Sequence, residues 1–378
     1  MRKTFKYRLY PTAEQIRTLD TWLMLCRRLY NACLEQRIAA WEKHKSVNYY
    51  GQANELPALK QALPEYKTVN AQALQDVVRR LEKAFQSFFL RCKQGATEKG
   101  FPKFQGRDRY NSITFSQTGW MVKDNRLHLS RCGAVKMKWH RPLLGDIKTV
   151  TVKRTKTGKW FVCFSCDNVP TPVYPEPVRE AVGIDLGIKV LAYPSEGEPF
   201  KNAQYLKRKL KHLRRLERHK ARQKKGSSNR RKTVRQIGVT HERVSNQRRD
   251  AHHKASAVLV RENVVIIHED ISPKFMIKNH RLAQAASDVG WSQFLTILQS
   301  KAAQAGRTVV AVDPRNTSQN CSSCRCVVPK KLHVRIHDCP HCGFRTDRDH
   351  NAALNILHRG IDSLRARTEP SDAKLGVA

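Results

Sequence analysis

Three acidic residues about eighty positions apart, with four cysteines just before the last, constrain this 378-residue chain more than any other feature. Asp185 closes the run AVGID, Glu269 closes NVVIIHE, and Asp349 follows a set of four cysteines. A carboxylate at the tip of a buried strand is costly to desolvate unless a cation or a proton lies nearby. In a chain of formal charge +39, three such carboxylates indicate a metal-dependent site that acts on a polyanion.

Each carboxylate also has a simpler interpretation to weigh. Asp185 alone suits a turn before Gly187, and Asp349 alone suits the N-cap of a helix over NAALNIL. Glu269 has no capping role after VVIIH. Together the three fit one Mg²⁺ site, because hard cations take oxygen ligands and keep waters that a substrate phosphate can replace. Two such ions about 3.5–4 Å apart can promote in-line displacement at phosphorus. Supporting or structural roles are expected for the neighbouring Asp270 and Asp347.

The cysteines form a second site. The spacing C-x2-C-x14-C-x2-C, made by Cys321, Cys324, Cys339 and Cys342, predicts a structural Zn²⁺ site without an open coordination position. Cys326 is an extra thiol beside the first pair, and a less favoured ligand. Eleven cysteines with this spacing favour a reducing cytoplasm over a disulfide scaffold. The other C-x2-C pair lies in a strand-like segment, where residues three apart face opposite sides, so it is not expected to bind metal: Cys163 and Cys166.

Composition indicates the partner. With 71 Lys and Arg against 32 Asp and Glu, nucleic acid is the expected ligand, and 40% hydrophobic residues suffice for a packed protein. An anionic membrane is the alternative, but no apolar stretch approaches the length of a span, and no apolar segment of a secretory signal follows the basic start.

Residues 201–250 hold 19 Lys and Arg against 3 acidic residues. Two apolar stripes at helical spacing run through and beyond this stretch: Leu206, Leu210, Leu213 and Leu216, then Val234, Ile237, Val244, Ala251, Ala255 and Val258. The segment GSSN separates them, which predicts a helical hairpin with basic outer faces. Such a surface binds phosphates without reading sequence.

Periodicity divides the chain into domains. An alternating strand near residues 3–9 precedes a capping box at Thr12 and Gln15 and a helical domain. Short alternating strands then predict a small β-barrel or sandwich, to which the first strand would belong. After a Pro-rich linker, strands alternate with helices over 178–358, which predicts an α/β domain with a mixed sheet.

These motifs resemble the OrfB/TnpB proteins of bacterial and archaeal transposons, which are considered ancestral to type V CRISPR effectors. GIDLG, HEDIS, CSSC…CPHC and DRDHNAALNI carry the resemblance, with RLYPT, GFPKF and NQRRDAHHKAS, from near residue 4 to about 358. The resemblance implies a nuclease of the RuvC-like, RNase H fold that uses Mg²⁺. A guide RNA from the transposon end would direct it to cut double- or single-stranded DNA beside a short transposon-adjacent motif. One departure is that Arg325 and Cys326 follow the second cysteine, where the family usually has glycine.

The resemblance makes Asp185, Glu269 and Asp349 the catalytic triad and the four cysteines a zinc-finger insert. Its domains fall in chain order: 1–11 as first strand of a wedge β-barrel, 12–95 as helical recognition domain, 96–175 as the rest of the barrel, 176–320 as RuvC-like nuclease with the basic hairpin, 321–342 as zinc finger, 343–360 as last RuvC element and 361–378 as flexible tail. The expected setting is the cytoplasm and nucleoid, with the oligomeric state open between a monomer and a dimer on the RNA and a monomer favoured.

Two groups of residues are nucleic-acid contacts in this scheme. Those expected to read the flanking motif are Tyr50, Asn54, Gln75, Ser116 and Gln117; those expected to hold the backbone are Lys207, Arg208, Arg214, Arg215, Arg249 and Lys254. Two other functions stay open. A transposase would use the same triad for strand transfer, since fold does not settle function. A nuclease-inactive RNA-guided binder is disfavoured by the intact triad.

Overall fold

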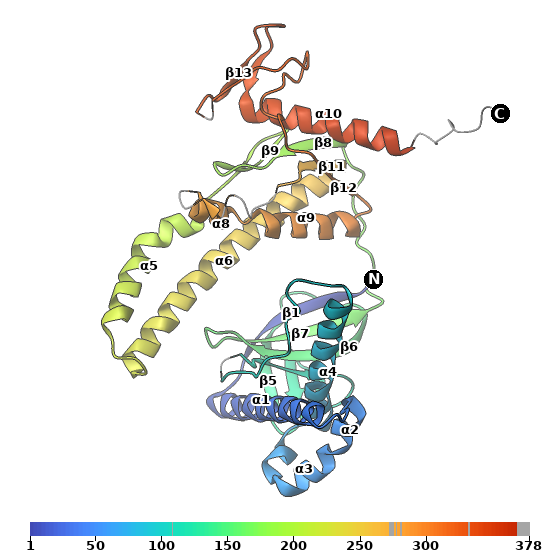
Figure 1. Ribbon diagram of the computed structural model, residues 1–378, viewed down its shortest axis with the longest axis vertical. Coiled ribbons are helices and arrows are strands. Elements are labelled where there is room, and N and C mark those ends of the chain that lie inside the picture. Colours follow the sequence, from blue (N-terminus) through green and yellow to red (C-terminus); the bar gives the residue numbers. More distant parts are fainter. Residues whose placement is uncertain (108, 272–275, 277, 280–281, 332, 369–378) are drawn as a thin grey trace, which may run out of the picture. The chain divides into compact units, whose positions relative to one another are not determined.

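The computed structural model describes residues 1–107, 109–271, 276, 278–279, 282–331 and 333–368 (Figure 1). The chain divides into two compact units between Pro170 and Thr171, within the Pro-rich linker. Val173 is 98% exposed there, while the next residue, Tyr174, packs against the core of the second unit. The two units are therefore described one at a time.

The first unit is built on a seven-stranded antiparallel sheet. Its strands are β1 (Lys3–Tyr10), β2 (Ser112–Phe115), β3 (Trp120–Lys123), β4 (Arg126–Leu129), β5 (Gly133–Lys138), β6 (Asp146–Arg154) and β7 (Trp160–Asp167). They run in the order β2-β6-β7-β1-β5-β4-β3. The strand at the start of the chain thus lies between β7 and β5, so this domain is discontinuous, with the helices inserted after β1.

A closed barrel is not formed by strand pairing, because β2 and β3 are the two edges of the sheet in the described part of the unit. The loop between them is held by a helix instead. The backbone N–H groups of Gln117 and Thr118 both donate to Oε1 of Gln72, at 2.8 and 2.9 Å. Backbone groups that would extend the ladder are thereby satisfied by a side chain.

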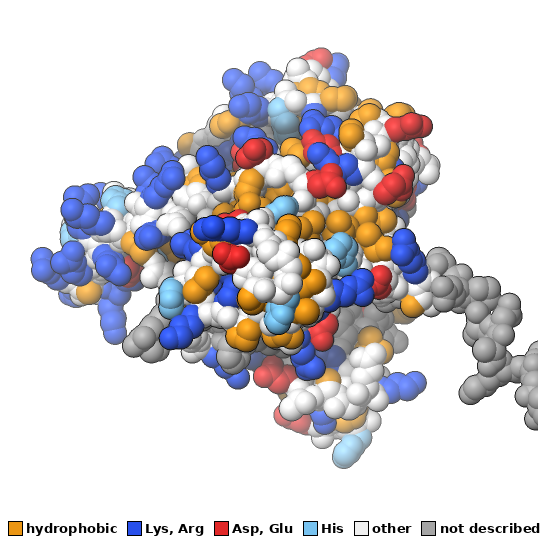
Figure 2. All heavy atoms as spheres, turned by 90° about the horizontal axis from the view of Figure 1, so that it is seen from above, with side chains coloured by type: hydrophobic (Ala, Val, Ile, Leu, Met, Phe, Trp, Pro, Cys, Tyr) orange, Lys and Arg blue, Asp and Glu red, His pale blue; other side chains and the backbone are white. Residues whose placement is uncertain are grey.

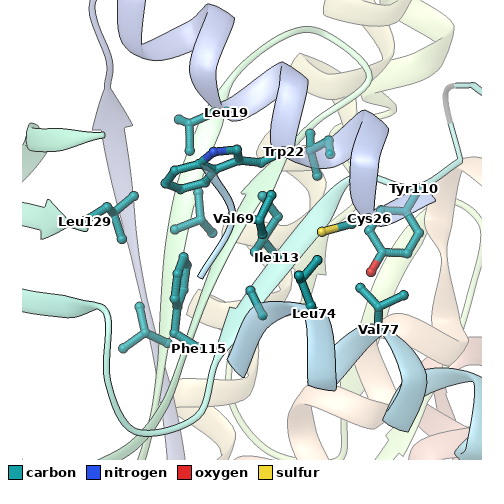
Figure 3. Packing of buried hydrophobic residues seen from close by; sticks show 14 of the residues in the cluster. Leu19, Trp22, Cys26, Val69, Leu74, Val77, Tyr110, Ile113, Phe115 and Leu129 are labelled. Atoms are coloured by element: carbon teal, nitrogen blue, oxygen red, sulfur yellow. The ribbon is translucent and has the colours of Figure 1, made fainter. Parts of the chain in front are cut away.

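The inserted helices are α1 (Ala13–Glu42), α2 (Tyr49–Asn54), α3 (Leu56–Ala62), the 3₁₀ turn η1 (Pro64–Thr68) and α4 (Ala71–Lys93). The predicted capping box at Thr12 and Gln15 is confirmed. Figure 3 shows how apolar side chains of α1 and α4 meet those of the sheet in one core: Leu19, Trp22, Cys26, Leu74 and Val77 with Ile113, Phe115 and Leu129. On β7, Cys166 is buried and Cys163 is half-buried on the other face, as their spacing predicts.

The second unit contains a mixed five-stranded sheet, as predicted. Its strands are β8 (Arg179–Asp185), β9 (Val190–Pro194), β10 (Phe200–Lys201), β11 (Asn263–Glu269) and β12 (Thr308–Val312), in the order β10-β9-β8-β11-β12. The first three form an antiparallel meander, and β11 and β12 run parallel to β8. One apolar cluster joins this sheet to α6 (Ser228–Glu262), α8 (Ala283–Val289) and α9 (Trp291–Gln304).

The predicted basic hairpin is formed by α5 (Tyr205–Arg222) and α6, which lie side by side and share a small apolar cluster of Leu213, Leu216 and Ile237 (Figure 1). Val234 was expected in the apolar stripe but is 49% exposed. Thr233 is buried instead, because it lies about one turn before Ile237 on the same face of the helix. Its hydroxyl donates a hydrogen bond to the Asn229 carbonyl, so the buried polar group has a partner. Within the described residues, none of the helices has both the length and the apolarity of a bilayer span.

The last helix, α10 (Arg348–Thr368), packs on the sheet through a second apolar cluster. A last element ending at 360 and a loose tail from 361 were expected, and this is wrong for residues 361–368. Ile361 and Leu364 continue the apolar spacing and pack with Ile267 of β11, which keeps the chain helical. The rest of the expected tail lies outside the described residues.

Candidate active site

Asp185 and Glu269 end two neighbouring parallel strands. In the register of β8 and β11, His268 lies opposite Ile184, so the next residue on each strand is a carboxylate at the same edge of the sheet. Glu269 is 9% exposed, and the β11–β12 register places it opposite Val312. The acidic ends of the two apolar runs are thus brought together by strand pairing.

Asp349 reaches this edge from α10. Two glycines allow the helix to lie close on the sheet, because a Cβ at Gly183 would overlap the carbonyl oxygen of Ala353 and one at Gly360 would overlap the Ile267 side chain. Asp349 lies in the first turn, where its N–H donates to Oδ1 of Asp347 at 2.7 Å. Asp347 therefore holds the first turn of the helix that carries Asp349, and its supporting role in a metal site stays a prediction.

The other neighbouring acid has a structural position. Asp270 is exposed, and its N–H donates to the carbonyl of Val312 at 2.8 Å, which extends the β11–β12 pairing by one residue. Its side chain faces solvent beside the candidate site.

The carboxylates act on one another electrostatically. Burial raises the pKa of Asp185 well above its usual range, and the charges of Glu269 and Asp349 raise it further. Burial also raises the pKa of Glu269, against the lowering effect of a hydrogen bond from the Thr317 hydroxyl and of the Arg359 charge. Asp185 thus feels the negative charge of two neighbouring carboxylates, and a cation beside it would stabilise its ionised form.

Asp349 has positive neighbours. Its Oδ1 lies 3.3 Å from Nη2 of Arg348 and 3.7 Å from Nη1 of Arg335. In the described part of the chain, the three carboxylates do not all offer oxygens within 4.8 Å of one another. The donor chemistry, three oxygen ligands with a desolvated acid among them, suits Mg²⁺.

The four cysteines converge fully. Their sulfurs all lie within 4.8 Å of one another, with Cys321 and Cys342 at 3.7 Å and Cys324 and Cys339 at 3.6 Å. A tetrahedron with metal–sulfur bonds of about 2.3 Å has edges of about 3.8 Å, so the cluster fits a four-thiolate metal site. The pKa of Cys342 is lowered to about 7, mainly because the backbone N–H of Phe344 donates a hydrogen bond to its sulfur. The lower pKa favours the thiolate, which is the form that binds metal.

The two cysteine pairs have the same backbone turn. The N–H of Arg325 donates to the carbonyl of Cys321, and the N–H of Gly343 donates to that of Cys339, both at 2.9 Å. Arg325 has φ of +65° and Gly343 has φ of +71°. The first turn therefore holds arginine in a conformation that favours glycine, at the position where the sequence departs from the family.

Cys326 lies outside the four-thiol group. Its carbonyl accepts the N–H of Cys321 at 2.9 Å, while its side chain is exposed. The second pair lies in the turn of the hairpin formed by β13 (Ile336–Asp338) and β14 (Arg345–Asp347), which leads directly into α10.

Sequence reasoning missed Thr317. Its hydroxyl donates to Oε1 of Glu269 at 2.5 Å, and its carbonyl accepts from Nδ2 of Asn355 at 2.9 Å. One available signal was its place in the loop after TVVAV. Parallel neighbouring strands end at the same edge of a sheet, so this loop had to pass Glu269.

The residues expected to read a flanking motif lie around α4 of the first unit. Gln75 is exposed one turn after Gln72, and Gln72 also accepts from the Ser116 hydroxyl at 3.2 Å. Tyr50 is 73% exposed on α2, which contacts α4 through Tyr49 and Arg79. The remaining two are also exposed: Asn54 and Gln117. Gln72, which was not predicted, hydrogen-bonds to Ser116, Gln117 and Thr118.

The predicted backbone contacts on the hairpin are all exposed: Lys207, Arg208, Arg214, Arg215, Arg249 and Lys254. Lys and Arg side chains crowd the projecting end at the left of Figure 2, which is this hairpin. A groove of about 620 Å³ between α5 and α6 is lined by four basic side chains, from Arg215, Lys232, Arg235 and Arg243. Lys254 is paired with Asp250 at 2.9 Å, so it is the least available of the six.

Comparison with known proteins defines the family. Three family models match: the OrfB_IS605 helix-turn-helix domain over 1–46, the OrfB_IS605 probable transposase over 164–280, and the Cas12f1-like TNB domain over 291–356. The first match covers β1 and the single long helix α1 rather than two short helices. The third covers the four cysteines and Asp349.

Two relatives that align along nearly their full length agree with these matches. A putative RNA-guided DNA endonuclease of Streptomyces pristinaespiralis is 34% identical, over 98% of this chain and 94% of its own. The putative RNA-guided DNA endonuclease InsQ of Escherichia coli (strain K12) is 28% identical, over 95% and 92%. A solved mini-RNA-guided endonuclease, CRISPR-Cas_phi3, aligns over 96% of this chain and 92% of its own, at 10% identity and a TM-score of 0.48. This chain belongs to the OrfB/TnpB family of transposon-associated RNA-guided nucleases.

Proposed function

We propose that this protein is an RNA-guided DNA endonuclease of a transposon that hydrolyses phosphodiester bonds at the Asp185–Glu269–Asp349 site. The observation that carries the proposal is the placement of Asp185 and Glu269 at one edge of the mixed sheet, with Asp349 held close by α10. Full-length relatives named as RNA-guided DNA endonucleases support the same function.

All three carboxylates would serve as ligands of the cations. Burial and the charges of the other two carboxylates all raise the pKa of Asp185, so a cation held here would most strongly favour the ionised form of this residue. Glu269 and Asp349 flank it from β11 and α10. When bound here, Mg²⁺ would activate a water and neutralise the leaving oxygen at the scissile phosphate. The guanidinium groups of Arg335 and Arg348 add positive charge beside Asp349, where a phosphate would lie.

The partners in this proposal are a guide RNA from the transposon end and a DNA target. Base pairing would supply sequence specificity, while protein contacts hold the backbone and read a short flanking motif. The basic hairpin suits the backbone role, and the polar group around Gln72, Gln75 and Tyr50 suits the motif. The four cysteines would hold a structural Zn²⁺ next to the last catalytic element.

The test uses protein purified with its copurifying RNA. Sequencing should map that RNA to one end of a mobile element, and a DNA target that matches its guide segment should be cut only with Mg²⁺. E269Q and D349N should keep the RNA and lose cleavage. If no RNA copurifies and the protein joins transposon ends by itself, the transposase function replaces this one.

A further inference from the structure

We propose that Thr317 is a positioning residue for Glu269: its hydroxyl holds Oε1 of the carboxylate so that Oε2 is presented to the bound cation. The proposal rests on the proposed function, because it assigns a role within that metal site. It adds a residue from the loop that precedes the cysteines to a site otherwise made by β8, β11 and α10.

The hydrogen bond is short and shielded. Thr317 Oγ1 lies 2.5 Å from Glu269 Oε1 and 3.1 Å from the carbonyl oxygen of Pro314. A hydroxyl has one proton to donate, and a carboxylate accepts a stronger bond than a neutral carbonyl. The proton therefore goes to Glu269 when Glu269 is ionised. Thr317 is 3% exposed and Glu269 is 9% exposed, so water does not easily substitute for the hydroxyl.

The loop that carries Thr317 is fixed by α10. Nδ2 of Asn355 donates to the carbonyls of Thr317 and Asn320, at 2.9 and 2.8 Å. One turn later, Nη1 of Arg359 donates to the carbonyls of Asp313 and Arg315, at 2.8 and 2.6 Å. Residues four apart lie on the same face of a helix, so one stripe of α10 determines the path of this loop.

One turn before Asn355, Asn351 continues the stripe toward the cysteines. Its Oδ1 accepts the N–H of Ser322 at 2.9 Å, and its Nδ2 donates to the Asn320 carbonyl at 2.7 Å. Asn351 is fully buried. The helix that carries Asp349 in its first turn thus also positions Glu269, through Thr317.

Loss of the Thr317 hydroxyl should weaken cation binding at Glu269. A hydrogen bond donated to an ionised carboxylate stabilises that form, and here it opposes the effect of burial on Glu269. Without the hydroxyl, Oε1 of Glu269 loses its buried hydrogen-bond donor, and the other carboxylate oxygen is less well aimed at the cation. Loss of a group that orients a metal ligand reduces metal affinity or activity about 10- to 100-fold.

The experiment compares T317V, which keeps the shape and loses the hydroxyl, with T317S, which keeps the hydroxyl. The matched control is T233V, since Thr233 is also 3% exposed and donates to a backbone carbonyl, within α6. Full-length variants are purified with their RNA, and DNA cleavage is followed against Mg²⁺ concentration. Mn²⁺ binding to the same RNA complexes is measured by electron paramagnetic resonance, so that sites on the RNA cancel between variants.

T317V should require about 10- to 100-fold more Mg²⁺ than the wild type, bind Mn²⁺ more weakly by a similar factor, and recover cleavage at high Mg²⁺. T317S and T233V should behave as wild type, and all variants should bind RNA and DNA equally. Wild-type metal dependence in T317V would overturn the proposal, as would an equal loss in T317S, since packing would then be the cause. If E269Q loses cleavage while T317V does not, only this proposal fails; if E269Q still cuts, the catalytic site itself is wrong.

Discussion

The carboxylate and cysteine sites of the second unit are assembled differently. The four cysteine sulfurs lie within 4.8 Å of one another, whereas the three carboxylates do not come so close together. Thiols are neutral until they lose a proton, so they can be packed in contact without a metal. Ionised carboxylates repel one another and resist burial, which the raised pKa of Asp185 records. The cysteine site should therefore increase the stability of the fold. The carboxylate site should decrease that stability, although it is the site expected to carry out catalysis.

The largest expected effect is on D185N. Cleavage should fall by about 10³-fold or more, which corresponds to about 4 kcal/mol of transition-state stabilisation. Folding should respond in the opposite direction. A folded-state pKa above the unfolded value means that ionised Asp185 opposes folding at every pH above about 4, so D185N should raise the melting temperature in Mg²⁺-free buffer at neutral pH. A lower melting temperature for D185N would contradict the contrast between the two sites.

C321S should have the reverse outcome. Loss of one thiolate from a closed four-ligand site removes folding free energy, so zinc content and melting temperature should both fall. C326S is the matched control, since Cys326 lies next to the cluster and outside it. Metal analysis and thermal unfolding of the two variants decide this. A C321S protein with normal melting and metal content would remove zinc from the proposal.

G183A tests how α10 is placed on the sheet. The added methyl group would overlap the Ala353 carbonyl, so the helix must shift and carry Asp349 with it. We expect a loss of about 1–3 kcal/mol in stability and of about 10²-fold in cleavage rate, since catalytic groups tolerate little displacement. G106A, with open space around it, is the control. Normal cleavage by G183A would show that close packing here does not position Asp349.

The pH dependence of the wild type should carry the signature of the carboxylate cluster. Because the pKa of Asp185 is raised, cleavage should decline with falling pH above the usual carboxyl range near 4. Protons and cations compete for the same oxygens, so the midpoint of this decline should move to lower pH as Mg²⁺ rises. A midpoint that stays constant over a wide range of Mg²⁺ would place the titrating group outside the metal site.

R325G should have the smallest effect and compares the two cysteine turns directly. Arg325 holds φ of +65° where its counterpart is Gly343. Glycine relieves this strain but adds freedom to the unfolded chain, so a gain of about 0.5–1 kcal/mol is expected. G343A should lose stability, since it introduces the strain that R325G removes. Chemical denaturation with zinc bound measures both, and equal stability of all three proteins would show that the turn is unstrained.

The sequence revealed the features that follow from local pattern. The apolar runs that end at Asp185 and Glu269 predicted where two strands end. The spacing of the cysteines predicted that their sulfurs lie together. Contacts set by tertiary packing could not be found this way. Thr317 has no periodic signal, and Val234 suits an apolar stripe until the hairpin turns Thr233 inward. The end of α10 was placed too early because Ile361 and Leu364 are too few to indicate a helix before their partner Ile267 is known.

The position of β1 bears on how this chain is made. Its partners β5 and β7 span residues 133–167, so the first ten residues leave the ribosome long before the strands they pair with. At about 5–20 residues per second, this delay is roughly 8–30 s. During that time α1 and α4 can form their helical hairpin, but the edges of β1 stay unpaired. Synthesis speed across the 133–167 segment should therefore determine how much of the nascent first unit is lost to aggregation.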